Sequence, residues 1–263
     1  MPERTRVTLL GTGTSTGVPV IGCDCRVCTS SDPRDTRTRC SALVEHEGLS
    51  ILVDVGPDFR MQALREGIRH IDAVLFTHHH FDHVVGLDDL RPLLFRNRRP
   101  IPCYAQPETE AILRSMFAYI FVDGSYPGVS NLSLEPIGNG RLTLKSREDP
   151  EVTGSVLPIP AMHGDTPVLG FRFGPIAYLT DTNLVPEESI KRLQGVDILV
   201  LDALRHEPHR SHYSFEEAAR VAEQVGARET WFVHMTHSVL HAEVDAGLPP
   251  GMRLAYDGLV LEA

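Results

Sequence analysis

The chain has 263 residues and a formal net charge of −10. Because affinity for phosphate backbones depends on clustered lysine and arginine, this balance argues against a long nucleic acid or an anionic membrane as a general partner. No uncharged apolar run approaches the roughly 18 residues of a membrane span, and no signal-peptide core follows the N-terminus, so we expect a cytoplasmic protein. A domain of this length can bury a core without disulfides.

Short apolar runs rich in β-branched residues alternate with helical patterns. In chain order they predict strands at Val7–Leu10 and Ile51–Val53, a helix at Phe59–Glu66, a strand at Ala73–Phe76, a helix at Glu108–Phe117, a strand at Ile176–Leu179, a helix at Glu187–Leu193, a strand at Ile198–Leu201, a helix at Phe215–Val225 and a strand at Thr230–Val233. This order favours a layered α/β arrangement. Ser214 is expected to cap the last helix. The Gly-, Pro- and Ser-rich stretch 123–150 predicts loops and hairpins, so we expect one domain over residues 1–263.

The strongest functional signal follows the predicted strand Ala73–Phe76. Four potential metal ligands lie within six residues, namely His78, His80, Asp82 and His83. Neutral imidazole and carboxylate suit Zn²⁺, Mn²⁺ or Fe²⁺. A solvated His-rich loop is the alternative, and this density of ligands directly after a buried strand argues against it.

Three further candidate ligands follow other apolar runs. His163 comes after Val156–Met162, Asp181 after Thr180, and His234 after Val233. Each could be structural on its own, since an Asp after a strand is often a turn former. Their recurrence at the ends of different strands indicates a site at one edge of a sheet.

These residues resemble the metallo-β-lactamase superfamily, whose His-x-His-x-Asp-His signature matches residues 78–83. The resemblance implies an αββα four-layer sandwich and a hydrolase with two metal ions. It implies that His78, His80 and His163 hold one ion, that Asp82, His83 and His234 hold the other, and that Asp181 bridges them. His79 is then expected to point away from the metals.

A second metal site is indicated by Cys23, Cys25 and Cys28, three thiols within six residues. A closed tetrahedral zinc site needs a fourth ligand, for which His237 is the candidate. The alternative is three reduced cysteines without a metal. Cys40 and Cys103 have no partners in the sequence and are expected to be buried thiols.

The Gly-rich segment 10–19, followed by Cys-x-Cys-x-x-Cys, resembles the phosphoribosyl cyclic-phosphate phosphodiesterases (PhnP-like) of phosphonate degradation. That resemblance implies a small phosphodiester substrate, such as a cyclic ribose or nucleotide phosphate, and a structural zinc in the loop near 23–28. A homodimer would fit it. The pyrroloquinoline quinone biosynthesis proteins carry a similar cysteine cluster, so the cluster leaves the substrate open.

Phosphodiester cleavage also needs a proton donor for the leaving oxygen, and histidine suits this role near neutral pH. His212 stands five residues before Glu217-Ala218, which resembles the His-x-Thr-x-x-Glu-Ala motif of tRNase Z. We therefore expect His212, Glu217 and Asp82 to form the catalytic set, with Glu217 orienting or polarising His212. Asp202 is expected to orient a metal-bound histidine. His206 and His209 are expected to be exposed loop residues.

The prediction is therefore a metal-dependent phosphoric diester hydrolase, with three other functions open. A tRNase Z-like RNA-processing nuclease is disfavoured by the net charge and by the lack of a Lys- and Gly-rich arm. The arginines at 91, 96, 98 and 99 form a basic patch, which could equally be a solvated face or an edge that recognises phosphate. A glyoxalase-type thioesterase would share the metals but has no evident use for His212. A non-enzymatic metal-binding protein would more often lack one of the ligands.

Overall fold

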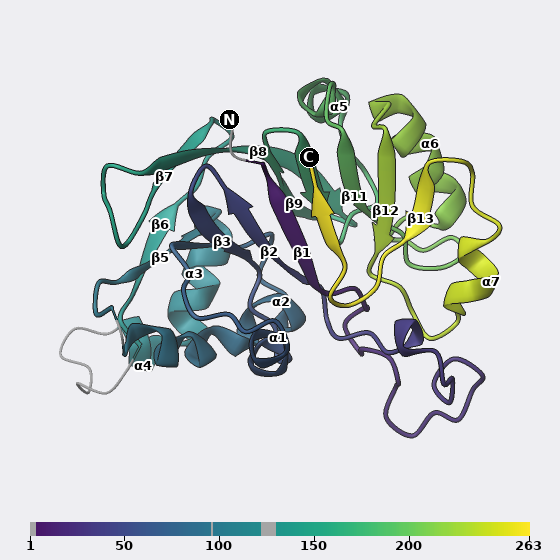
Figure 1. The fold of residues 1–263 in the computed structure, drawn as a ribbon, viewed down its shortest axis with the longest axis horizontal. Helices are drawn as coiled ribbons and strands as arrows, with labels where there is room; N and C mark the ends of the chain where they lie inside the picture. Colours follow the sequence, from purple (N-terminus) through teal and green to yellow (C-terminus); the bar gives the residue numbers. More distant parts are fainter. Residues whose placement is uncertain (1–3, 96, 122–129) are drawn as a thin grey trace.

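The computed structural model describes residues 4–95, 97–121 and 130–263. Two seven-stranded sheets lie face to face, and helices cover the outer face of each (Figure 1). The predicted αββα sandwich is therefore confirmed. No helix in the described residues is long and apolar enough to span a membrane.

The first sheet comprises, in spatial order, β14 (Val260–Glu262), β1 (Arg6–Gly11), β2 (Ser41–His46), β3 (Leu49–Val53), β4 (Ala73–Leu75), β5 (Ile101–Ala105) and β6 (Leu132–Pro136). The helical segments between its strands are η1 (Pro33–Asp35), α1 (Phe59–Arg65), α2 (Phe81–Val84), η2 (Val85–Leu94), α3 (Pro107–Met116) and α4 (Ala118–Phe121). The second sheet comprises β13 (Met252–Leu254), β12 (Glu229–Val233), β11 (Ile198–Asp202), β10 (Ile176–Leu179), β9 (Thr166–Phe173), β8 (Thr153–His163) and β7 (Leu142–Lys145). Its helices are α5 (Glu187–Leu193), α6 (Phe215–Val225) and α7 (His241–Asp245).

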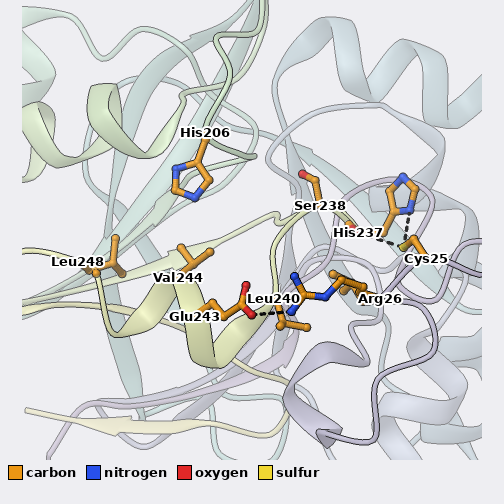
Figure 2. A pocket seen from close by; sticks show the side chains of 11 residues that line it. Cys25, Arg26, His206, His237, Ser238, Leu240, Glu243, Val244 and Leu248 are labelled. Carbon is orange, nitrogen blue, oxygen red and sulfur yellow. Dashed lines mark hydrogen bonds and ion pairs between the residues drawn. The ribbon is translucent and has the colours of Figure 1, made fainter.

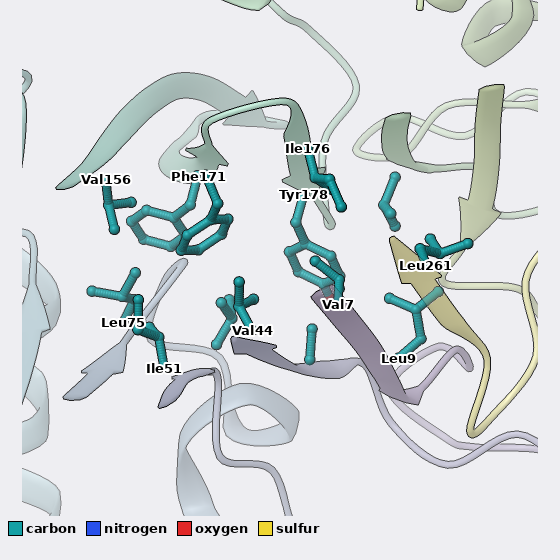
Figure 3. Packing of buried hydrophobic residues seen from close by; sticks show 14 of the residues in the cluster. Val7, Leu9, Val44, Ile51, Leu75, Val156, Phe171, Ile176, Tyr178 and Leu261 are labelled. Atoms are coloured by element: carbon teal, nitrogen blue, oxygen red, sulfur yellow. The ribbon is translucent and has the colours of Figure 1, made fainter. Parts of the chain in front are cut away.

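The continuous apolar runs in the sequence reflect strands that are buried on both faces. In β11, Ile198 and Val200 point into the core between the sheets, whereas Leu199 and Leu201 pack in the cluster formed with α5 and α6. Successive residues of a strand point to opposite faces, so both sets must be apolar. Figure 3 shows the core between the sheets, to which Val7 of β1 and Phe171 of β9 both belong.

The predicted helices agree with the structure to within one residue at each end. Ser214 and Glu217 form a capping box at the start of α6, and Gly226 ends the helix in a left-handed conformation (φ 71°). The stretch 123–150 agrees with the prediction in part. The chain crosses from β6, an edge of the first sheet, to β7, an edge of the second, and β7 then forms an antiparallel hairpin with β8; residues 123–129 lie outside the described part.

Candidate metal centre and active site

Strand ends bring the candidate ligands together. His163 is the last residue of β8, Asp181 follows β10, and His234 follows β12. Asp181 and His234 have positive φ values of 50° and 67°, which side-chain-bearing residues rarely adopt. Such strained backbone directly after a strand is characteristic of functional sites, where the surroundings hold it in place.

The seven residues predicted to form the two-metal site converge in two overlapping sets. The first set is His78, His80, His163 and Asp181, and the second is Asp82, His83, Asp181 and His234; in each set the ligand atoms all lie within 4.8 Å of one another. Asp181 belongs to both sets, which is the arrangement a bridging carboxylate requires. All seven are buried except His80, which is half-buried.

The polar atoms of this cluster fit metal binding. Among the residues that the structure describes, His78 Nε2, His83 Nε2 and His234 Nε2 are buried and make no hydrogen bond of good geometry, although Asp181 oxygens lie 3.9, 3.2 and 3.1 Å from them. Buried polar nitrogens are rarely left unpaired, so these atoms call for a ligand such as an ion. Burial also lowers the pKa of His78 and of His163, which favours the neutral imidazole that binds metals.

The charges around His83 also favour a cation. Its Nε2 lies 3.2 Å from Asp181 Oδ1 and 3.2 Å from Asp82 Oδ2. Burial opposes a charged imidazole, but Asp181, Asp54 and Asp82 together raise the pKa of His83. The carboxylates thus stabilise positive charge at this position, which a divalent ion would supply in place of a proton.

Asp54 is a functional candidate that the sequence analysis missed. It follows β3, is fully buried and has a φ of 60°. His83 Nδ1 lies 2.7 Å from Asp54 Oδ2, and the backbone N–H and hydroxyl of Thr77 both donate to the Asp54 carboxylate at 2.8 Å. A carboxylate in this position orients a ligating imidazole. The available signal was an Asp directly after a buried strand, the same signal that identified Asp181.

His212 lies next to one histidine of each ligand set. Its ring centroid is 4.5 Å from that of His163 and 4.5 Å from that of His234. His212 Nδ1 is 2.8 Å from Asp202 Oδ2, which also accepts a hydrogen bond from the Thr182 backbone N–H. Burial opposes the charged form, but Asp202 outweighs it and raises the pKa of His212. A histidine held protonated in this place can donate a proton to a bound substrate.

The structure assigns Glu217 to a different contact from the one expected. Its carboxylate accepts hydrogen bonds from the backbone N–H and the hydroxyl of Ser214, at 2.8 and 2.7 Å. These contacts cap α6, so the carboxylate that orients His212 is Asp202. We expected Asp202 to orient a metal-bound histidine. Its Oδ1 lies 3.8 Å from Nδ1 of the candidate ligand His234, which is longer than a hydrogen bond.

The remaining candidates lie as follows. His206 and His209 are exposed. His79 is half-buried and belongs to neither ligand set among the described residues. Of the basic patch, Arg91, Arg98 and Arg99 are exposed, and the arginine at 96 lies outside the described residues.

The cysteine cluster and His237 also converge. His237 Nδ1 lies 3.3, 3.5 and 3.6 Å from the sulfur atoms of Cys23, Cys25 and Cys28. A tetrahedral zinc with Zn–S near 2.3 Å and Zn–N near 2.05 Å would separate sulfur and nitrogen by about 3.6 Å. The four side chains therefore have the spacing of a closed zinc site. Cys40 and Cys103 are buried thiols, as expected.

Comparisons with known proteins agree with this geometry. The β-lactamase superfamily domain matches residues 50–235. A crystal structure of a diphosphatase from the PhnP family superposes with a TM-score of 0.90 and 43% identity, covering 100% of this chain and 98% of that one. An octanoyltransferase of Porphyromonas gingivalis is 42% identical over 258 residues, 97% of this chain and 51% of that protein, so the chain spans about half of its length.

Coenzyme PQQ synthesis protein B of Methylobacterium radiotolerans is 27% identical over 313 residues, 97% of this chain and 99% of that protein. The matched domain contains every candidate ligand of the two-metal site. The chain therefore belongs to the β-lactamase superfamily, and it is a PhnP-like metal-dependent hydrolase.

Proposed function

We propose that this chain is a binuclear metal-dependent phosphodiesterase that acts on small phosphodiesters. The observation that carries the proposal is the place of His212, which pairs with Asp202, stacks on His234 of one ligand set and meets His163 of the other edge to face. A proton donor above a two-metal centre is what cleavage of an ester to a poor leaving group requires. A thioester has a better leaving group and less need of such a donor.

The residues of the site would divide the work as follows. One ion would be held by His78, His80 and His163, the other by Asp82, His83 and His234, with Asp181 between them. When bound, two divalent ions activate water and stabilise negative charge on phosphorus. Asp202 accepts a hydrogen bond from the Nδ1–H of His212, which leaves the Nε2–H to protonate the departing oxygen.

Two classes of substrate are supported. Cyclic ribose and nucleotide phosphodiesters are the first, from the resemblance of the Gly-rich segment and the cysteine cluster. Diphosphate-bridged diesters are the second, because the PhnP-family relative at 43% identity is a diphosphatase. In both reactions a nucleophile attacks phosphorus, so the same metal centre can catalyse either one.

The test is steady-state hydrolysis by the zinc- or manganese-loaded protein and its His212→Ala variant. Nucleoside 2′,3′-cyclic phosphate has an alkoxide leaving group, whereas bis(p-nitrophenyl) phosphate releases a phenolate that needs little protonation. We expect the variant to lose roughly 10²-fold or more in kcat on the cyclic substrate and clearly less on the aryl ester. His206→Ala, which changes an exposed histidine of the same loop, is the matched control and should retain wild-type rates.

Two results would contradict the proposal. If His212→Ala lowers kcat equally on both substrates, His212 is not the proton donor. If the protein hydrolyses an octanoyl thioester but not the cyclic phosphate, the aryl ester or a dinucleoside diphosphate, it is a thioesterase and not a phosphodiesterase.

A further inference from the structure

The segment from His234 to His237 joins the two candidate metal sites. His234 Nε2 lies 3.1 Å from Asp181 Oδ1, and His237 Nδ1 lies within 3.6 Å of three thiol sulfurs. Only two residues separate the histidines. Three residues of chain span at most about 10 Å, so the two sites share one short stretch of backbone.

The backbone between them is held on both sides. Met235 donates its N–H to the carbonyl of Thr12 and accepts from the N–H of Thr14, both at 3.1 Å, and Thr236 donates to the Leu204 carbonyl at 3.1 Å. His234 itself has the left-handed φ of 67°. Such a conformation persists only where the surroundings impose it, so the contacts of the following residues help to set the direction of the His234 ring.

Apart from the Leu204 carbonyl, the contacts that hold this segment come from the part of the chain around the cysteines. Thr12 and Thr14 belong to the Gly-rich turn that precedes Cys23 by a few residues. The Val20 N–H lies 3.3 Å from Cys28 Sγ, and the fully buried Arg37 side chain donates to the carbonyls of Thr236 and Val239. The cysteine loop and the histidine segment thus support each other, and His237 is the side chain at which they meet.

We propose that His237 is a positioning residue for the active site, acting through His234. Closure of the Cys₃His site fixes the position of Thr236, and this orients His234 toward Asp181. The inference rests on the proposed two-metal centre. Loss of the Cys₃His site should therefore weaken the ion held by Asp82, His83 and His234, whereas the ion held by the first ligand set keeps its affinity. Changes one contact away from a metal ligand typically weaken binding 10–100-fold.

The test compares His237→Ala with His237→Cys in the full chain. Zinc bound after equilibrium dialysis is counted by elemental analysis, and the active-site ions are followed by the absorption spectrum of the cobalt-substituted protein. We expect three ions in the wild type. In His237→Ala we expect loss of the thiolate-bound ion and at least tenfold weaker binding of one further ion. His237→Cys, which supplies four thiolates, should restore both. Cys103→Ser, a buried thiol on β5, controls for a general loss of stability.

Two outcomes separate this inference from the proposed function. If His237→Ala loses one ion and binds the other two with wild-type affinity, the positioning role is refuted while the two-metal centre stands. If the wild type binds only the thiolate-held ion, the two-metal centre itself is refuted.

A measurement on the unaltered protein covers the case in which His237→Ala does not fold. A pocket of about 510 Å³ is lined by Cys25 and His237 on one side and by α7 and His206 on the other (Figure 2). It gives a mercurial such as p-hydroxymercuribenzoate access to the thiol of Cys25, and mercury displaces zinc from thiolates but not from imidazole and carboxylate. With zinc at the thiolates and cobalt in the two-metal site, we expect release of the zinc to be followed by weaker binding of one cobalt ion. Release of the zinc with no change in the cobalt spectrum would overturn the inference.

Discussion

The replacement of Asp202 by Asn tests which carboxylate orients His212. Asp202 is fully buried, and its Oδ2 lies 2.8 Å from His212 Nδ1. Asn preserves the shape and removes the charge. Hydrogen bonds to charged groups contribute about 1.5–3 kcal/mol, which corresponds to roughly a 10- to 150-fold change. We therefore expect kcat on a 2′,3′-cyclic phosphate to fall by about that factor near neutral pH.

The pH profile of Asp202→Asn should change in a defined direction. Asp202 raises the pKa of His212 against the effect of burial, so the variant should have a lower His212 pKa. An acid must be protonated to act, and activity falls as pH rises through its pKa. The alkaline limb of the kcat profile should therefore move to lower pH in the variant. Metal content is measured in parallel, since Asp202 Oδ1 lies 3.8 Å from His234 Nδ1.

Glu217→Gln is the matched comparison, because it removes the carboxylate that the sequence motif indicates. Its contacts cap α6 through Ser214, so we expect a loss of about 1 kcal/mol in the free energy of unfolding and little change in kcat. Wild-type kcat in Asp202→Asn together with a tenfold or larger loss in Glu217→Gln would refute the reasoning.

Two further predictions concern metal binding and stability. Asp181→Ala should lose the metal pair and turnover, because Asp181 alone belongs to both ligand sets; elemental analysis and kinetics that show two tightly bound ions and full activity would rule out the bridging role. Asp72→Ala should lower the free energy of unfolding by about 2–4 kcal/mol at pH 7, because its buried carboxylate accepts hydrogen bonds from Ser50, Ser146 and Arg147. Burial raises the pKa of Asp72, but the backbone N–H groups of Ser50 and Arg147 outweigh it and hold the pKa below its usual range. The stabilisation is thus complete above the unfolded-state pKa of about 3.9 and disappears as pH falls through the lowered folded-state pKa, so urea denaturation should show the two proteins converging in acid.

Local features of the sequence predicted much of the fold and the outline of the site. Helix α6 was predictable residue by residue, because a Ser N-cap, an acidic first turn and a terminal Gly act over one turn of backbone. Residues 78–83 indicated a metal site because four ligands adjoin one buried strand. The need for a fourth zinc ligand pointed to His237 on chemical grounds.

Other features depend on contacts between residues that are remote in the chain. The path of β6 and β7 into different sheets was not predictable, because the intervening Gly-, Pro- and Ser-rich stretch has no pattern that selects a partner strand.

The pairing of His83 with Asp54, 29 residues earlier, was likewise hidden, and so was the choice of Asp202 over Glu217 as the partner of His212. A sequence motif lists residues that are near in the chain, but a hydrogen bond needs atoms within about 3 Å. The partner of His212 is a carboxylate oxygen of Asp202, at the end of β11. The parallel pairing of β10, β11 and β12 brings the carboxyl ends of these strands to one edge of the sheet. The sequence by itself thus determined which chemical groups the site contains, and only the tertiary structure decided which of them touch.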